Sequence, residues 1–180
     1  MARVVIKFGG TSLGSIEKIT KVASLIKKKK TNIDEIIVVV SAMAGQTNDL
    51  IEMSKKISKN YDKAELDVLL ATGEQVSSSL LSAALVDQGC KSRSWLSWQI
   101  PIITEGSHNA SRIYRSNTEE IIKFLKSGGI PVVPGFQGVS KNLRLATIGR
   151  GGSDASAVAI AKFFNADFCE IYTDVEGVYT

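Results

Sequence analysis

The sequence predicts an α/β fold in which a parallel or mixed sheet is covered by helices on both faces. Short β-branched runs alternate with stretches of helical apolar periodicity, which is typical of such sheets. No repeat or low-complexity linker interrupts this alternation. With 180 residues, of which 44% are hydrophobic and 22% charged, the chain can bury a sizeable core in one domain.

The first half of the chain is expected to form two strands and three helices. Residues 4–8 make a β-branched strand, and residues 36–40 make a fully buried one. Ser15 with Glu17 begins the first helix, which ends in the lysine run 27–30. The apolar helical positions are Ile16, Ile19, Val22, Ala23 and Ile26; then Leu50, Ile51 and Ile57 after a start at Thr47 or Asn48; and then Val76, Leu80, Leu81, Ala84 and Leu85 before a stop at Gly89.

The second half adds two strands, two helices and an excursion between them. Asn117 caps a helix that ends near residues 128–129, residues 130–133 return as a strand, and residues 139–146 form an excursion or hairpin. The last strand covers residues 168–173. The final helix carries Ala157, Val158, Ala161 and Phe164.

Two glycine-rich turns predict an anion site in two halves. Gly9-Gly10 follows the first strand, in which Lys7 lies just before the turn, and residues 149–154 (GRGGSD) open the final helix. Unshielded backbone amides and the positive end of a helix dipole favour phosphate or carboxylate. Because there are two turns, we expect two bound anions.

Composition argues against nucleic acid and membrane partners. The formal charge is +4, and the lysine run 27–30 alone supplies four charges, so the rest of the chain is neutral. We interpret this run as the solvated C-terminal end of a helix, where positive charge complements the helix dipole. No apolar run is long enough for a signal peptide core or a membrane span. Cys90 and Cys169 lack the paired spacing of a zinc site, which predicts a reduced, cytoplasmic setting.

The common nucleotide-binding motifs are absent. Gly9 and Gly14 have P-loop spacing, but Ser15 stands where that motif needs lysine. A dinucleotide fingerprint would need glycine in place of Asp154, and neither the catalytic nor the metal-binding loop of protein kinases occurs. A phosphate site of another type remains.

Six sequence blocks then carry a resemblance to a known family. They are KFGGTS (7–12), VVVSAMAGQTNDL (38–50), GEQVSSSLL (73–81), PGFQG (134–138), TIGRGGSDASAVA (147–159) and IYTDVEGVYT (171–180). In this order they resemble the catalytic domain of aspartokinases, within the amino acid kinase family. KFGG alone would also suit relatives that phosphorylate glutamate, acetylglutamate, uridylate or carbamate, whereas GRGGSD with SAMAGQT singles out aspartate.

The resemblance implies a three-layer α/β/α sandwich with a mostly parallel central sheet. It also implies ATP-dependent phosphorylation of the side-chain carboxylate of L-aspartate with Mg²⁺, the step that leads to lysine, threonine, methionine and diaminopimelate. A carboxylate with a pKa near 3.9 is ionised at neutral pH, so the nucleophile needs no general base. The reaction needs in-line positioning and charge neutralisation instead.

The resemblance assigns roles to matching residues. Lys7 would stabilise the transferring phosphoryl group, and Asp154 would organise the lysines or metal around it. Arg150 would clamp the α-carboxylate of aspartate, which a planar guanidinium fork suits, and Glu74, at the start of its helix, would face the ammonium group. The substrate pocket is completed by Ser41, Ala42, Thr47, Phe136 and Ser153. The nucleotide is approached by Gly9, Gly10, Gly151, Gly152, Thr173, Asp174 and Tyr179. No set of protein metal ligands is expected.

Three other residues receive structural interpretations. His108, without partners at metal-ligand spacing, reads as a polar loop residue, although the resemblance places that position near the aspartate pocket. Trp95 and Trp98 read as core or interface packing rather than nucleobase platforms.

Residues 1–180 are expected to be a partial aspartokinase catalytic domain, because family members continue through an Ala-Asp-Pro-Arg segment. The nucleotide lobe would be incomplete, no regulatory ligand-binding domain would be present, and an unpaired strand edge would favour self-association. Two alternatives stay open. The chain is part of a functional kinase, as a homodimer or completed by a separately encoded C-terminal chain, or it is a silent remnant that binds aspartate or a partner.

Overall fold

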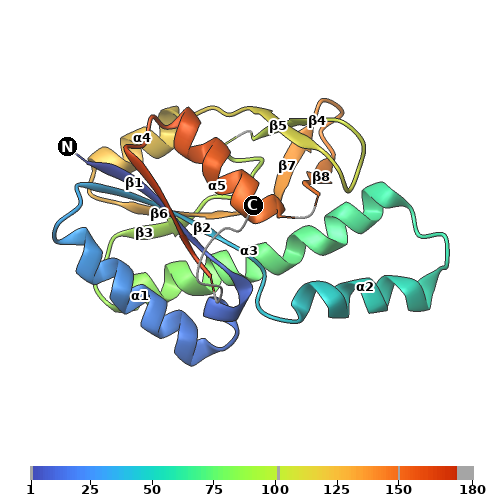
Figure 1. Cartoon of the computed structure of the whole chain (residues 1–180), viewed down its shortest axis with the longest axis horizontal. Helices are drawn as coiled ribbons and strands as arrows, with labels where there is room; N and C mark the ends of the chain where they lie inside the picture. The colour runs from blue at the N-terminus through green and yellow to red at the C-terminus, as the bar shows by residue number, and fades with distance from the viewer. Residues whose placement is uncertain (1, 101, 150, 174–180) are drawn as a thin grey trace, which may run out of the picture.

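The computed structural model describes residues 2–100, 102–149 and 151–173 and has three layers (Figure 1). Its central sheet contains five parallel strands in the order β3-β6-β2-β1-β9. In chain order these strands are β1 (Arg3–Phe8), β2 (Glu35–Val40), β3 (Ser92–Ser94), β6 (Ile130–Pro134) and β9 (Phe168–Tyr172). The α/β class, the layered architecture and the parallel sheet are confirmed.

Two pairs of helices cover the two faces of this sheet (Figure 1). α1 (Ile16–Lys30) and α3 (Lys63–Asp87) lie on one face, and α4 (Glu119–Lys126) and α5 (Gly152–Phe163) lie on the other. A short 3-10 helix, η1 (Gly10–Leu13), follows β1. α2 (Gln46–Ile57) packs beside the first half of α3, away from the sheet.

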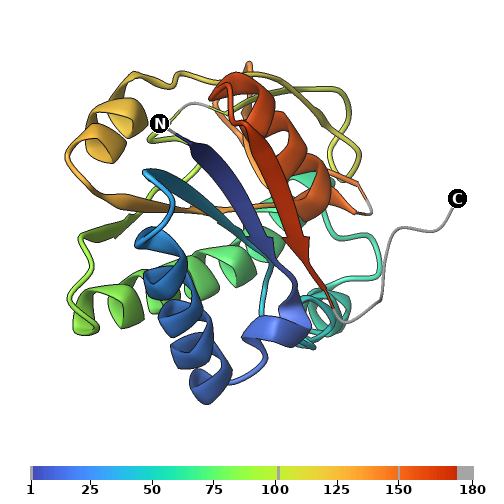
Figure 2. The same cartoon turned by 60° about the vertical axis from the view of Figure 1, so that its left-hand side comes forward.

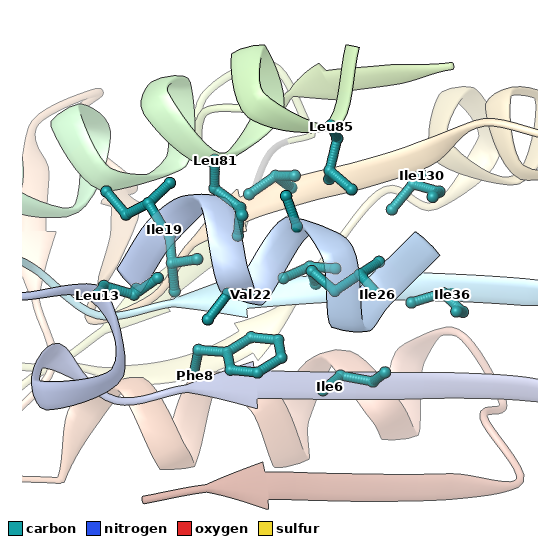
Figure 3. Packing of buried hydrophobic residues seen from close by; sticks show 14 of the residues in the cluster. Ile6, Phe8, Leu13, Ile19, Val22, Ile26, Ile36, Leu81, Leu85 and Ile130 are labelled. Carbon is teal, nitrogen blue, oxygen red and sulfur yellow. The ribbon is translucent and has the colours of Figure 1, made fainter. Parts of the chain in front are cut away.

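Alternation along the strands builds one core on each face. In β1, Ile6 and Phe8 point to α1 and α3, while Val5 points to α4 and α5, because successive side chains of a strand leave opposite faces. Figure 3 shows the core on the α1 and α3 face, where Val22 and Ile26 of α1 pack with Ile6 and Phe8. The side chain of Lys7, like that of Val5, points to the face of the sheet that α5 covers. It can therefore reach residues at the start of α5.

The structure contains a second, four-stranded sheet, most of which is not predicted from the sequence. Its order is β5-β4-β7-β8, from β4 (Ile103–Glu105), β5 (Arg112–Arg115), β7 (Gln137–Ser140) and β8 (Leu145–Thr147). The predicted excursion over residues 139–146 is the antiparallel hairpin β7–β8. β3, β4 and β5 have only three or four residues each and show no alternating apolar pattern, so no local signal marks them.

Two helix starts differ from the prediction. α2 begins at Gln46 because Gly45, with φ +85°, turns the chain just before it, so the expected start at Thr47 or Asn48 is one to two residues late. α3 is 25 residues long and begins after Asp62, whose side chain accepts hydrogen bonds from two first-turn amides. Glu74 therefore lies in the middle of its helix rather than at its start.

Several apolar residues expected in the core are exposed. These are Ile16, Ile57, Val76 and Val158, and Trp98 is exposed as well, whereas Trp95 is buried. The lysine run is less free than expected, because Lys29 pairs with Glu170 of β9 at 2.8 Å. Both cysteines are free thiols. Within the described residues, no helix is long and apolar enough to cross a membrane.

Candidate active site

A pocket of about 250 Å³ lies where β1, β2 and β6 end. Ligand sites of parallel α/β sheets form beyond the carboxyl ends of the strands. Lys7 comes from the end of β1, Ser41 and Ala42 from the turn after β2, and Phe136 from the turn after β6. The described residues that line it are Lys7, Ser41, Ala42, Thr47, Glu74, Phe136, Gly151, Gly152, Ser153 and Asp154.

An ion pair between Lys7 and Asp154 joins the two predicted turns. Lys7 Nζ lies 2.6 Å from Asp154 Oδ1, and the side chains are 8% and 49% exposed. Lys7 reaches this partner because it projects from the α5 face of the sheet, and Asp154 lies in the first turn of α5. The pair places a nearly buried cation next to the positive end of a helix.

The first glycine turn is held close to the backbone around it. A Cβ on Gly10 would lie 2.7 Å from Ala42 O, so only glycine fits there. The Gly9 N–H donates to Tyr172 O at 3.0 Å. In this structure the Gly9 amide is thus bonded to β9, and its expected contact with phosphate stays a prediction. Neither glycine lines the pocket itself.

Glu74 forms the buried end of the pocket. Its Oε1 accepts a hydrogen bond from the Ala42 N–H at 3.0 Å, and its Oε2 is buried without a hydrogen-bond partner among the described residues. Burial raises the pKa of Glu74 to about 7, which the hydrogen bond from Ala42 only partly counteracts. Because Glu74 lines the pocket, its unpartnered carboxylate oxygen suits a cationic ligand group there.

The approach of α3 to this turn depends on small residues around Glu74. A Cβ on Gly73 would lie 2.8 Å from the Ala42 methyl group, and Ser77 Oγ donates to Ser41 O at 2.7 Å. Both come from the GEQVSSS segment. Gly73 and Ser77 are not among the site residues predicted from the sequence, although both lie in the GEQVSSSLL block (73–81).

The opposite wall is made by Phe136 and the start of α5. Phe136 has φ +65°, a left-handed conformation that costs a bulky residue energy, and its N–H donates to Ser156 Oγ at 3.0 Å. A Cβ on Gly152 would lie 2.7 Å from the Phe136 ring. Gly151, with φ +72°, is the N-cap residue just before the helix. Glycine at 152 thus lets the aromatic ring pack on the helix start.

The remaining predicted residues lie elsewhere. Thr173 lines a separate groove with Thr11, Ser12 and Lys18. Arg150, Asp174 and Tyr179 lie outside the described residues. The structure therefore brings the predicted catalytic and substrate residues together, except for Arg150, and places Gly9, Gly10 and Thr173 outside that pocket.

Within the described ranges, no group of three or more His, Cys, Asp and Glu side chains could hold a metal ion. Mg²⁺ keeps several waters and is commonly held by one or two carboxylates together with substrate phosphates. The half-exposed carboxylate of Asp154 at the pocket fits that mode of binding.

Comparisons with known proteins agree on one family. The amino acid kinase family matches residues 2–180. An aspartate kinase of Pseudomonas putida is 48% identical over 180 residues, which cover all of this chain and 44% of that protein. The aspartokinase of Rickettsia conorii is 45% identical and is covered to 46%. The chain thus spans less than half the length of these relatives.

Solved structures show the same fold. Aspartate kinase from Synechocystis superposes with a TM-score of 0.83 at 46% identity, over 98% of this chain and 29% of that chain. E. coli aspartokinase III, solved in complex with aspartate and ADP, gives a TM-score of 0.87 at 23% identity, over 99% of this chain and 50% of that chain.

Proposed function

We propose, from the premise that this chain belongs to the amino acid kinase family, that it phosphorylates the side-chain carboxylate of L-aspartate with ATP, giving aspartyl phosphate. The observation that carries the proposal is the pairing of opposite charges in one small pocket. Lys7 lies at one side, and the unpartnered oxygen of Glu74 lies at the other. Aspartate offers a cationic group for Glu74 and an anionic group near Lys7.

Each wall of the pocket would have a distinct task. Glu74, with Ser41 and Ala42, would receive the ammonium group. Phe136 and the start of α5 would confine the substrate from the other side, with Ser153 and Arg150 binding carboxylate oxygens. Such confinement holds the nucleophile in line with the transferred phosphoryl group, which is most of what this reaction requires.

Lys7 would supply the charge that the reaction needs. As negative charge spreads over the transferred phosphoryl oxygens, a nearly buried ammonium stabilises them more strongly than it would in water. The substrate carboxylate is already ionised, so no protein base has to remove a proton. Among the described residues, the pocket lining contains neither histidine nor cysteine.

Mg²⁺ would be held by the phosphates of ATP and by Asp154. When bound, it would neutralise charge on the phosphate oxygens. The first-turn amides at Gly152 and Ser153 would bind a phosphate or carboxylate oxygen, with Lys7 positioned by Asp154 at their side. Gly9, Gly10, Thr173, Asp174 and Tyr179 remain the residues proposed for the rest of the nucleotide.

The wider setting follows the same resemblance. The product would enter the synthesis of lysine, threonine, methionine and diaminopimelate in the cytoplasm, where the two free thiols would stay reduced. Assembly as a homodimer or with a separate C-terminal chain belongs to this proposal too.

A second candidate is aspartate binding without turnover. It is favoured by the geometry of the pocket, because residues proposed for aspartate, such as Glu74 and Phe136, line it, whereas Gly9, Gly10 and Thr173, proposed for the nucleotide, do not. The two candidates differ in phosphoryl transfer but share aspartate recognition.

Two measurements on the purified chain separate these candidates. Hydroxylamine traps the acyl phosphate formed from L-aspartate, ATP and Mg²⁺, and calorimetry measures aspartate binding without nucleotide. We expect Lys7→Met to lower the trapped product by about 10²-fold or more while the protein stays folded, because a transition-state cation is lost. Lys55→Met, at an exposed position of α2, is the matched control.

Aspartate binding without trapped product would support the second candidate. No aspartate binding in the calorimeter, with D-aspartate and L-glutamate as references, would overturn both. Equal product from Lys7→Met and wild type would remove Lys7 from the reaction.

A further inference from the structure

A buried carboxylate outside the pocket holds three separate segments together. Asp67 lies on α3 with its side chain 0% exposed. Its Oδ2 lies 2.6 Å from His108 Nδ1, and the Asn109 N–H donates to both oxygens, at 3.2 and 3.3 Å. Thr147 Oγ1 donates to Oδ1 at 2.5 Å. These partners satisfy a carboxylate that would otherwise be costly to bury.

The partners of Asp67 belong to the segments that lead into the pocket wall. Thr147 is the last residue of β8 and is followed by Ile148 and Gly149, which precede the start of α5. The Ser111 N–H donates to Thr147 O at 3.2 Å, and Asn109 O would lie 3.6 Å from a Cβ on Gly149. Residues 147–149 are therefore held between the 107–111 loop and α3.

Helix α3 also carries Glu74, on the same face as Asp67. The two residues are seven positions apart, which is close to two turns and about 10 Å along the helix. Between them, Gln137 Nε2 of β7 donates to Ala71 O at 3.0 Å. One face of α3 thus presents Glu74 to the pocket and fixes the β7–β8 hairpin, from which Phe136 and the start of α5 extend.

We propose that Asp67 is a positioning residue: with His108 and Thr147 it fixes the distance between the Glu74 wall of the pocket and the wall formed by Phe136 and residues 151–154. This inference concerns the geometry of the pocket. Only its consequence for aspartate affinity rests on the proposed function.

Asp67→Asn tests this role, because asparagine keeps the size of the side chain and removes its charge and one acceptor oxygen. The matched control is Glu65→Gln, two residues earlier on α3, where Glu65 also binds the β7–β8 hairpin, through Arg144 at 2.6 Å, but at the surface. His108→Ala is a milder second variant, since the His108 side chain is 30% exposed.

The first readout is amide hydrogen exchange measured by NMR and needs no ligand. We expect the Ser111, Asp154 and Ala155 amides to exchange about tenfold faster or more in Asp67→Asn, with a smaller effect in His108→Ala and none in Glu65→Gln. His108 is the chain's one histidine. Its ring ¹⁵N signals should therefore report an Nδ1–H bonded to the Asp67 carboxylate, and a proton on Nε2 alone would contradict the described contact.

The second readout is aspartate affinity, measured by calorimetry under conditions where each variant is folded by circular dichroism. A positioning role predicts affinity lowered about tenfold or more in Asp67→Asn and unchanged in Glu65→Gln. Unchanged exchange at Asp154 and Ala155 would overturn the proposal, and so would faster exchange with wild-type affinity. If wild type itself binds no aspartate, the proposed function fails while the exchange data still decide the role of Asp67. If Asp67→Asn does not fold, His108→Ala gives the decision by the same criteria.

Discussion

Replacing Glu74 with glutamine should stabilise the protein at alkaline pH. Glutamine has the same size, and its oxygen can still accept the hydrogen bond from the Ala42 N–H. It cannot ionise, so the variant avoids the cost of a buried charge whose Oε2 has no partner among the described residues. The ionised form of Glu74 is therefore a source of instability until a cationic ligand arrives.

The size of the effect follows from the pKa of Glu74, which burial raises from 4.5 to about 7. Between these pH values the folded protein binds one proton more than the unfolded chain, so the free energy of unfolding falls by about 1.4 kcal/mol per pH unit. The contribution is fully present below pH 4.5 and is lost as the pH rises through 7. At pH 8.5 we expect Glu74→Gln to be more stable than wild type by about 3 kcal/mol, and at pH 4 the two should be equal.

Urea unfolding followed by circular dichroism between pH 4 and 8.5 measures this difference. Because all other titrating groups are common to both proteins, the difference isolates Glu74. A difference in unfolding free energy that is the same at every pH would refute the reasoning. Calorimetry of aspartate binding at pH 6, in buffers of different ionisation enthalpy, tests the raised pKa of Glu74 independently. Binding to wild type should release protons from Glu74, because a cationic ligand group favours its ionised form. Binding to Glu74→Gln should release none.

Three further outcomes test the packing. Gly152→Ala places a methyl group 2.7 Å from the Phe136 ring and should lower the free energy of unfolding by about 1–3 kcal/mol. Urea unfolding measures this loss, and an unchanged midpoint would show that the ring moves freely. Leu81→Ala, in the core of Figure 3, should cost about 2–5 kcal/mol in the same assay, whereas Val158→Ala at an exposed site should change stability little. Phe168→Lys on the exposed β9 should reduce any self-association seen in sedimentation experiments, and equal association would place the contact elsewhere.

The sequence indicates the main sheet and most of the pocket because both depend on local patterns. β-branched runs mark β1 and β2, and the glycine turns mark the places where Lys7 and Asp154 come together. The mutual approach of these turns could be expected, since strands that run parallel end at the same edge.

Other features depend on contacts that no local pattern records. Asp67 lies in the first half of α3, and His108 and Thr147, which bind it, are 41 and 80 residues away in the chain. The start of α3 at Lys63 could not be read from apolar periodicity, because that half of the helix packs on α2 and the small sheet rather than on the main core. The bond from the Gly9 N–H to Tyr172 O likewise needs the last strand in place.

The position of β1 in the sheet has a consequence for how the protein is made. β1 lies between β2 and β9 (Figure 2), and its pairing with β9 joins Val4 to Phe168 and Phe8 to Tyr172. During synthesis β1 can pair early with β2, but its other edge waits until residues 168–172 have left the ribosome. Until then the strand that carries Lys7 exposes unpaired backbone groups, and this interval is when a growing chain is open to aggregation or to a chaperone.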